Sequence, residues 1–260
     1  MQAETNEIHS NAEEIPMHKT MILSLLLAAQ AFAVDIPASS TPIPALPGFG
    51  LYGQIWQAVD SNGDAVTMNW TSFAQAKADL NVDGRSPDAT FIGGTIDYGS
   101  SSFSLVSDWL GADAVSLSPK GFGSRPLRGV YVRLQGSLAI PDTYNSIALP
   151  NQSLVFAVTS DDGMRLTIGN QVVAEYDADR SAGTDTTLVV FGGPGLYPIT
   201  LEYFNGADDG AVLKLGWDIL QDQNYTTVPT SLLYPAPEPA NWTLVAAGLG
   251  LLAFSLNRRR

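Results

Sequence analysis

The sequence predicts an all-β fold, an antiparallel β-sandwich or barrel with at most one short helix. Turn-forming residues recur along the whole chain, with 24 glycines and 16 prolines among 260 residues. Between them lie short runs in which apolar and polar residues alternate, which is the pattern of strands with one buried face. Many short strands separated by turn clusters, without an internal repeat, favour two packed sheets or a closed barrel.

The clearest strands lie in the second half of the chain, where most runs show the period of two. These runs begin at Gly129, Ser153, Met164, Gln171, Thr186, Tyr197 and Ala211. Gly169 and Asn170 separate two of the runs and suit the positive-φ positions of a two-residue hairpin turn. Only residues 72–80 predict a helix, with Ser72 as the N-cap.

Residues 1–33 have the features of a secretory signal peptide. Lys19 precedes an apolar run over residues 21–29, and a small-x-small triplet ends at Ala33, after which cleavage is expected. The acidic stretch before Met17 is atypical of a signal peptide, so translation starting at Met17 is an alternative. A short buried helix is a second alternative for the apolar run.

The rest of the chain is long enough for one domain with a substantial core. We expect a Pro-rich linker over residues 34–49, a β domain over residues 50–222 and a second linker over residues 223–236. Residues 237–260 then form a separate C-terminal segment.

This C-terminal segment combines a Pro-Glu-Pro triplet, an apolar run over residues 242–256 and a cluster of arginines. The residues of the triplet and the cluster are Pro237, Glu238, Pro239, Arg258, Arg259 and Arg260. Basic residues after an apolar run favour a membrane anchor with a cytoplasmic end, although the run is shorter than the roughly 20 residues of a comfortable transmembrane helix. The sequence therefore predicts a short transmembrane helix.

The order of these elements resembles the PEP-CTERM sorting signal of Gram-negative bacteria. The resemblance implies transient anchoring in the inner membrane, processing by an exosortase, and delivery to the cell surface or the extracellular matrix. A plain tail anchor is the alternative.

Charge and residue usage exclude several classes of function. The chain has 26 acidic and 13 basic residues, a formal net charge of −13. Nucleic acid is therefore not an expected partner, because phosphate binding requires basic patches. Carboxylate-rich surfaces instead suit Ca²⁺, which prefers oxygen ligands.

The expected mature chain has neither cysteine nor histidine. The sequence contains no cysteine, and His9 and His18 both precede the cleavage point. This excludes Ser-His-Asp and Cys-His nucleophile systems and histidine or thiolate zinc sites. Catalysis by carboxylates alone, as in glycoside hydrolysis, would remain available.

Two adjacent carboxylates interrupt the strand that begins at Ser153. Side chains along a strand alternate between its faces, so Asp161 and Asp162 cannot both reach solvent if the extended run continues through them. We therefore expect the strand to end in a turn at this pair.

Several segments together resemble the PA-fourteen (PA14) domain, a β-rich module named after the anthrax toxin protective antigen. This module also occurs in yeast flocculins, adhesins and some bacterial glycosidases. The segments are GLYGQIWQ from Gly50, FIGGTIDYG, VYVRLQGSLAIP, SLVFAVTSDDGMRLTIGNQVVAEYD and GLYPITLEYFNGADDGAVLKLGW. The resemblance covers most of residues 50–220, but only the second half is rich in motifs.

The resemblance implies a calcium site. In sugar-binding members, adjacent aspartates joined by a cis peptide bond chelate Ca²⁺, and a second loop adds an Asn side chain and backbone carbonyls. The matching metal ligands here are Asp161, Asp162, Asn205, Ala207 and Asp209. Asp161, Asp162, Asn205 and Asp208 would contact the sugar, whose hydroxyls complete the six to eight oxygens that Ca²⁺ prefers. A purely structural turn at the aspartate pair is the alternative.

Two other features are weaker. Residues 60–64 resemble the start of an EF-hand loop, but Ala65 stands where that loop requires Gly, so an ordinary Asx-rich turn is expected. Four tryptophans could stack on sugar rings, namely Trp56, Trp70, Trp109 and Trp217, of which Trp217 is expected in the core.

The resulting hypothesis is an exported, non-enzymatic, calcium-dependent carbohydrate-binding module that is sorted to the cell surface or matrix. Its expected partner is an exopolysaccharide of the biofilm matrix. The alternatives are a structural extracellular matrix or envelope protein without a ligand site, and a glycosidase-associated module.

Overall fold

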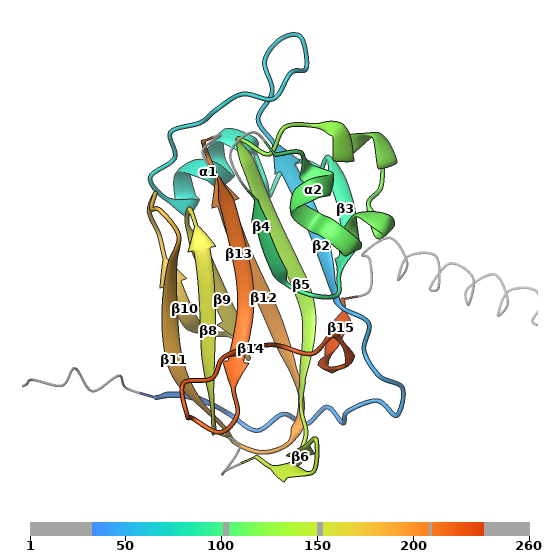
Figure 1. Ribbon diagram of the computed structural model, residues 1–260, viewed down its shortest axis with the longest axis vertical. Coiled ribbons are helices and arrows are strands. Elements are labelled where there is room, and N and C mark those ends of the chain that lie inside the picture. Colours follow the sequence, from blue (N-terminus) through green and yellow to red (C-terminus); the bar gives the residue numbers. More distant parts are fainter. Residues whose placement is uncertain (1–32, 101–103, 150–152, 208–209, 237–260) are drawn as a thin grey trace, which may run out of the picture. The chain divides into compact units, whose positions relative to one another are not determined.

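Two β-sheets pack face to face in the computed structural model (Figure 1). The structure describes residues 33–100, 104–149, 153–207 and 210–236, which all belong to the unit Ala31–Arg260. Within these residues, one sheet has six strands, the other has seven, and all pairings but one are antiparallel. The predicted all-β sandwich is confirmed.

The first sheet has the strand order β1-β11-β8-β13-β14, and β4 also pairs with β13. Its strands are β1 (Val34–Ile36), β4 (Asp97–Ser100), β8 (Ser153–Asp161), β11 (Gly183–Phe191), β13 (Ala211–Asp218) and β14 (Thr226–Thr227). The short edge strand β1 runs parallel to β11.

The second sheet has the order β10-β9-β12-β5-β2-β3, and β15 also pairs with β5. Its strands are β2 (Leu51–Gln57), β3 (Ala89–Gly93), β5 (Val130–Ile140), β9 (Met164–Ile168), β10 (Gln171–Tyr176), β12 (Gly195–Asn205) and β15 (Leu233–Pro235). The predicted hairpin joins β9 to β10, and Gly169 and Asn170 have φ angles of 56° and 69°. A small hairpin of β6 (Thr143–Tyr144) and β7 (Ile147–Ala148) stands apart from both sheets.

Among the described residues, two α-helices pack against the sandwich, both near its upper end in Figure 1. The predicted helix is α1 (Phe73–Leu80), and the Ser72 side chain caps it by accepting from the Gln75 amide at 3.2 Å. The expectation of at most one helix is wrong, because α2 (Val106–Leu110) is also present, with 3₁₀ turns η1 (Gly111–Ser116), η2 (Lys120–Ser124) and η4 (Thr230–Leu232). A helix as short as α2 shows too few turns for a 3.6-residue period to be recognised in the sequence.

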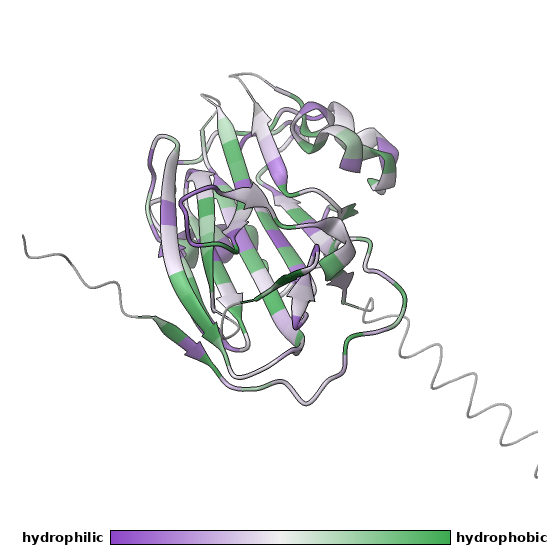
Figure 2. Ribbon diagram, turned by 60° about the horizontal axis from the view of Figure 1, so that its bottom comes forward, coloured by the Kyte–Doolittle hydropathy of each residue, from purple (hydrophilic) through white to green (hydrophobic). Residues whose placement is uncertain are grey.

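The alternation along the strands builds the main core between the sheets. Figure 2 shows apolar and polar bands following one another along many strands. On β8, for example, Leu154, Phe156 and Val158 are buried between the sheets. Burial of such side chains stabilises the sandwich by about 1.5–3 kcal/mol each relative to exposure.

A second apolar cluster lies on the opposite face of the second sheet. Trp56, Tyr131 and Phe204 alternate with core residues of β2, β5 and β12, so they point away from the first sheet. Helix α1 covers them with Phe73 and Ala76. The residues of the cluster are therefore buried although they face outward from the sandwich.

The two segments expected to be linkers are part of the domain instead. Within residues 34–49, β1 pairs with β11, and the chain then passes the lower ends of the strands (Figure 1), where the Ser39 hydroxyl donates to the Leu196 carbonyl at 2.7 Å. Within residues 223–236, β14 and β15 each pair with a sheet. Proline-rich composition suggested a linker because prolines break regular elements, but extended proline segments also bind along the edges of sheets.

Several predictions fall outside the described residues. These are the signal peptide up to residue 32 and the sorting signal with Pro237, Glu238, Pro239, Arg258, Arg259 and Arg260, including its short transmembrane helix. In the described part of the chain, no helix is both long enough and apolar enough to cross a membrane.

Candidate functional site

The aspartate pair lies where β8 ends. Asp161 is the last residue of the strand, and its peptide bond to Asp162 is cis, as the family resemblance implied. The Tyr203 hydroxyl donates to the Asp161 carbonyl, and the Ser160 hydroxyl donates to the Asp162 carbonyl at 2.7 Å. The predicted turn is therefore confirmed, and side chains of β12 and β8 hold its backbone.

Asp162 places a carboxyl group in a buried position. The residue is 5% exposed, and its Oδ2 accepts from the Gly206 amide at 2.9 Å. Burial, together with the carboxyl groups of Asp179 and Asp161, raises the pKa of the Asp162 carboxyl to about 7, against the opposing Gly206 hydrogen bond. A negative charge is thus disfavoured here unless a cation accompanies it.

Asn205, the last residue of β12, is fully buried. Its Nδ2 donates to the Leu127 carbonyl at 3.2 Å, whereas its Oδ1 has no hydrogen-bond partner among the described residues. Leaving a buried carbonyl oxygen unpaired costs about 1–3 kcal/mol. Asn205 Oδ1 is therefore a candidate to coordinate a cation or to accept a hydrogen bond from a bound molecule.

The fold brings these two residues together from distant parts of the chain. Gly206, which directly follows Asn205, donates to Asp162, and the Phe204 amide donates to the Gly163 carbonyl at 3.1 Å. The backbone that follows Asn205 therefore contacts the Asp162 carboxyl group. The candidate donors are the carboxyl groups of Asp161 and Asp162 and the Oδ1 atom of Asn205. This donor set contains only oxygen, which fits Ca²⁺ and does not favour zinc or copper.

The second loop is described only in part. Ala207 lies half-buried in a bend directly after β12, whereas Asp208 and Asp209 lie outside the described residues. Within the described ranges, no three Asp, Glu, His or Cys side chains gather into a group that could hold a metal ion. The described candidate ligands are therefore Asp161, Asp162, Asn205 and the carbonyl of Ala207.

Sequence reasoning missed two residues of the loop after β10. Asp179 interacts with the Asp162 carboxyl. Arg180 donates to the Ser160 hydroxyl at 2.8 Å and forms an ion pair with Asp185 at 2.7 Å. No spacing pattern connects this loop to the aspartate pair, because only the folding of β10 back along β9 brings it close.

The structure also tests the predicted turn at residues 60–64 and the four tryptophans. Asp60 Oδ1 accepts from the Asn62 and Asp64 amides at 2.8 and 2.9 Å, which confirms the expected Asx-rich turn. Trp217 is in the core as predicted. The other three tryptophans are also almost completely buried, so stacking of a sugar on Trp56, Trp70 or Trp109 is excluded in this conformation.

Residues 153–231, from the start of β8 to η4, match the family model of the PA14 domain. This part of the chain is similar to the PA14 domain family. The solved structure of a PA14 sugar-binding domain from an RTX adhesin is similar, with 27% identity, a TM-score of 0.56, and coverage of 74% of this chain and 100% of that chain. No curated protein sequence matches the chain.

Two more distant structures share the fold of this chain. The PA14 domain of the MpAFP antifreeze protein has 22% identity and a TM-score of 0.58, over 78% of this chain and 99% of that one. The epithelial adhesin 6 A domain from Candida glabrata, solved with Galβ1-3GlcNAc, has 15% identity and a TM-score of 0.53, over 79% and 95%. These likenesses support the sandwich architecture described above.

Proposed function

We propose that this chain is a non-enzymatic carbohydrate-binding module whose sugar is held by Ca²⁺ at Asp161, Asp162 and Asn205. The observation that carries the proposal is the buried Asn205 Oδ1, which has no partner among the described residues, in a residue whose neighbour Gly206 donates to the buried Asp162 carboxyl. The similarity to a sugar-binding PA14 domain supports carbohydrate as the ligand class.

Each residue has a distinct role in the proposal. The carboxylates of Asp161 and Asp162 supply negative charge, and Asn205 Oδ1 supplies a neutral oxygen. Carbonyl oxygens of Ala207 and Asp209 complete the protein ligands, and Asp208 lies close enough in sequence to contact the sugar. When bound, Ca²⁺ would offer its remaining coordination positions to sugar hydroxyls, since it takes six to eight oxygens.

Local electrostatics favour a cation at this position. The carboxyl groups of Asp179 and Asp161 each disfavour a negative charge on the buried Asp162. The neighbouring Arg180 is engaged with Asp185 and lies over the Tyr176 ring, with 4.0 Å between the guanidinium carbon and the ring centroid. The positive charge that would balance the carboxyl groups is therefore expected from a bound ion.

The proposed location is the cell surface or the extracellular matrix. Export would use the signal peptide over residues 1–33, and sorting would use the segment from Pro237 to Arg260 with an exosortase and the inner membrane as transient partners. The proposed ligand is then an exopolysaccharide of the matrix. Similarity to a domain of an adhesin supports a surface location.

A structural role without a ligand is the second candidate. It is favoured by the hydrogen bonds that the turn already makes, from Gly206 to the Asp162 carboxyl and from Tyr203 and Ser160 to the two carbonyls. In that case the aspartate pair would only shape the chain between β8 and β9.

Thermal unfolding of the whole protein in chelator and in Ca²⁺ separates the two candidates. A ligand at a hundredfold excess over its Kd stabilises the folded state by about 2.7 kcal/mol, which raises Tm by roughly 5–10 °C for a domain of this size. We expect this rise in the wild type but not in Asn205→Leu. Asp60→Asn with Asp64→Asn is the matched control, because it alters an exposed acidic turn and should keep the response.

An unchanged Tm in the wild type would overturn the calcium site and leave the structural role. If the shift is found, binding of Galβ1-3GlcNAc and lactose with and without chelator tests the sugar. Release of reducing sugar from the same oligosaccharides would contradict the non-enzymatic assignment.

A further inference from the structure

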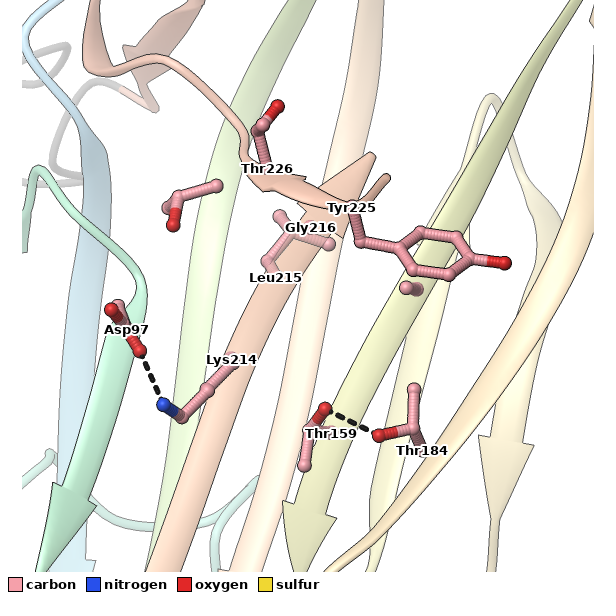
Figure 3. Close-up of a pocket in the computed structure, with 10 residues that line it drawn as sticks. Asp97, Thr159, Thr184, Lys214, Leu215, Gly216, Tyr225 and Thr226 are labelled. Atoms are coloured by element: carbon pink, nitrogen blue, oxygen red, sulfur yellow. Dashed lines mark hydrogen bonds and ion pairs between the residues drawn. The ribbon is translucent and has the colours of Figure 1, made fainter. Parts of the chain in front are cut away.

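A groove of about 310 Å³ lies on the outer face of the first sheet, on the side away from the core (Figure 3). Thr159 and Lys214 line it, and both alternate with core residues of β8 and β13. The volume is at the lower end of the range of about 300–1,000 Å³ that small-molecule sites occupy. None of the calcium-site residues proposed above lines this groove.

A row of four polar side chains crosses four neighbouring strands in the groove. Lys214 on β13 is in register with Asp97 on β4 and with Thr159 on β8, and Thr159 is in register with Thr184 on β11. Because neighbouring strands lie about 4.8 Å apart, the row extends over roughly 14 Å. An extended ligand lying across the strands could therefore contact all four side chains.

The row offers hydrogen-bond donors and acceptors without a net charge. Lys214 Nζ and Asp97 Oδ1 form an ion pair at 2.8 Å, and both side chains are about half exposed. The hydroxyls of Thr159 and Thr184 lie 2.7 Å apart, so one donates to the other. A hydroxyl pair of this kind keeps one O–H donor and several lone pairs for a ligand.

Small residues create the depth of the groove. The row next to the polar one contains Gly216 on β13 and Ala157 on β8, which are in register. A Cβ atom added at Gly216 would lie 3.3 Å from the Thr226 carbonyl oxygen and 3.8 Å from the Tyr225 Cβ. A side chain at Gly216 would therefore crowd the backbone at Thr226 and narrow the groove beside Tyr225.

Tyr225 supplies an aromatic surface. Its side chain lines the groove, is 41% exposed, and comes directly before β14. In Figure 3 the ion pair and the Tyr225 ring stand on opposite sides of the strand that carries Gly216. An aromatic ring with a polar tip can pack against an apolar face and hydrogen-bond at its edge.

We infer that this groove is a second saccharide-binding site, which takes a neutral oligosaccharide and requires no metal. Sugars combine hydroxyl groups with apolar C–H faces, which match the polar row and the Tyr225 ring. The paired charges of Asp97 and Lys214 and the acidity of the whole chain disfavour an anionic ligand. The inference shares only the class of ligand with the proposed function, because the two sites have no residue in common.

The test uses the whole protein in chelator, with cellotetraose, maltotetraose and lactose as probes, followed by calorimetry or NMR titration. We expect at least one probe to bind the wild type. Tyr225→Ala and the pair Thr159→Val with Thr184→Val should each weaken this binding at least tenfold, and Gly216→Val should abolish it. Phe49→Ala is the matched control, because Phe49 is an exposed aromatic residue outside the groove.

The outcomes separate this site from the calcium site. Binding in chelator that the groove variants weaken and Asn205→Leu preserves supports the groove. Absence of binding in chelator overturns it, as does binding that the folded Tyr225→Ala and double-threonine variants retain. Calcium-dependent binding that only Asn205→Leu removes would support the proposed function and overturn the groove site.

Discussion

The buried carboxyl groups of Glu202 and Asp162 have opposite surroundings. Glu202 lies on the outward face of β12 and is 8% exposed, and Asp162 is 5% exposed. Glu202 lies 2.6 Å from Lys77 Nζ and accepts a hydrogen bond from the Tyr131 hydroxyl. Asp162 instead faces other carboxyl groups.

The surroundings shift the two pKa values in opposite directions. Burial alone would raise the pKa of Glu202, but the hydrogen bonds and charges of Lys77, Tyr131 and Arg133 lower it overall. Burial raises the pKa of Asp162, and its acidic neighbours add to that rise. The comparison teaches that burial of a carboxyl group is not itself a sign of function, whereas burial among like charges is.

The charge of the Glu202 carboxyl is therefore balanced by basic side chains, and these contacts serve the structure. Glu202 joins α1, through Lys77, to the second sheet, where Arg133 and Arg165 lie 3.8 Å from its carboxyl oxygens. Asp162 and Asn205 lack such compensation, and the proposed cation would provide it.

The largest expected effect follows from breaking these contacts of Glu202. Glu202→Ala leaves the surrounding cations without their shared partner, and removing one member of a buried ion pair costs about 3–5 kcal/mol. Urea unfolding should show this loss. Glu175→Ala is the control, because Glu175 pairs with Arg165 at the surface, and such pairs contribute about 1 kcal/mol or less. Equal losses in both variants would contradict the distinction.

An intermediate effect is expected from two buried amides. Gln57 is fully partnered, since its Nε2 donates to the Pro126 and Arg128 carbonyls and its Oε1 accepts from Arg125. Gln57→Leu should cost roughly 2–3 kcal/mol, because several buried groups lose their partners. Asn205→Leu removes an oxygen without a described partner and a single hydrogen bond, from Nδ2 to the Leu127 carbonyl, so in chelator it should cost about 1 kcal/mol, less than Gln57→Leu. A large loss in chelator would show that Asn205 Oδ1 serves the fold and not a ligand.

The pH dependence of stability should have opposite signs at the two carboxyl groups. For Asp162, the folded chain keeps a proton that the unfolded chain releases, so its contribution falls as pH rises from 3.8 to about 7. For Glu202, the folded pKa lies below 4.5, so its contribution is present above that pH and is lost as pH falls through the folded pKa.

Unfolding in chelator across this pH range measures both slopes. Asp162→Asn should remove the decline towards neutral pH, and Glu202→Gln should flatten the acid limb. The prediction is contradicted if the free energy of unfolding changes equally between pH 4 and 7 in the wild type and in Asp162→Asn. That result would show that ionising the Asp162 carboxyl does not destabilise the fold.

Much of the fold was predictable from the sequence, because the alternation of apolar and polar residues is a local signal. The run from Ser153 predicted β8 with both its ends, and Ser72 predicted the start of α1. The strands β1 and β15 were missed because each has only three residues and gains its stability from pairing with a distant strand. Local sequence carries little information about such pairings.

The candidate site was predictable only in part. The adjacent aspartates stood out within an apolar strand, and the family resemblance supplied Asn205 and the cis peptide bond. The proximity of Asp179 and the unpaired state of Asn205 Oδ1 depend on how β8, β10 and β12 converge. The groove beside Tyr225 depends on the register of four strands, which no local pattern specifies.

The interleaved strand order also affects how the chain folds. Strand β1 pairs with β11, and β15 pairs with β5 while the Leu233 carbonyl accepts from the Gly50 amide, so the earliest and latest described segments are both needed to complete the sheets. Folds dominated by such distant pairings form in milliseconds to seconds, far more slowly than helical bundles. Under the proposed export, slow closure would keep the chain extended while it crosses the membrane, and the sandwich would assemble only after residue 235 had emerged.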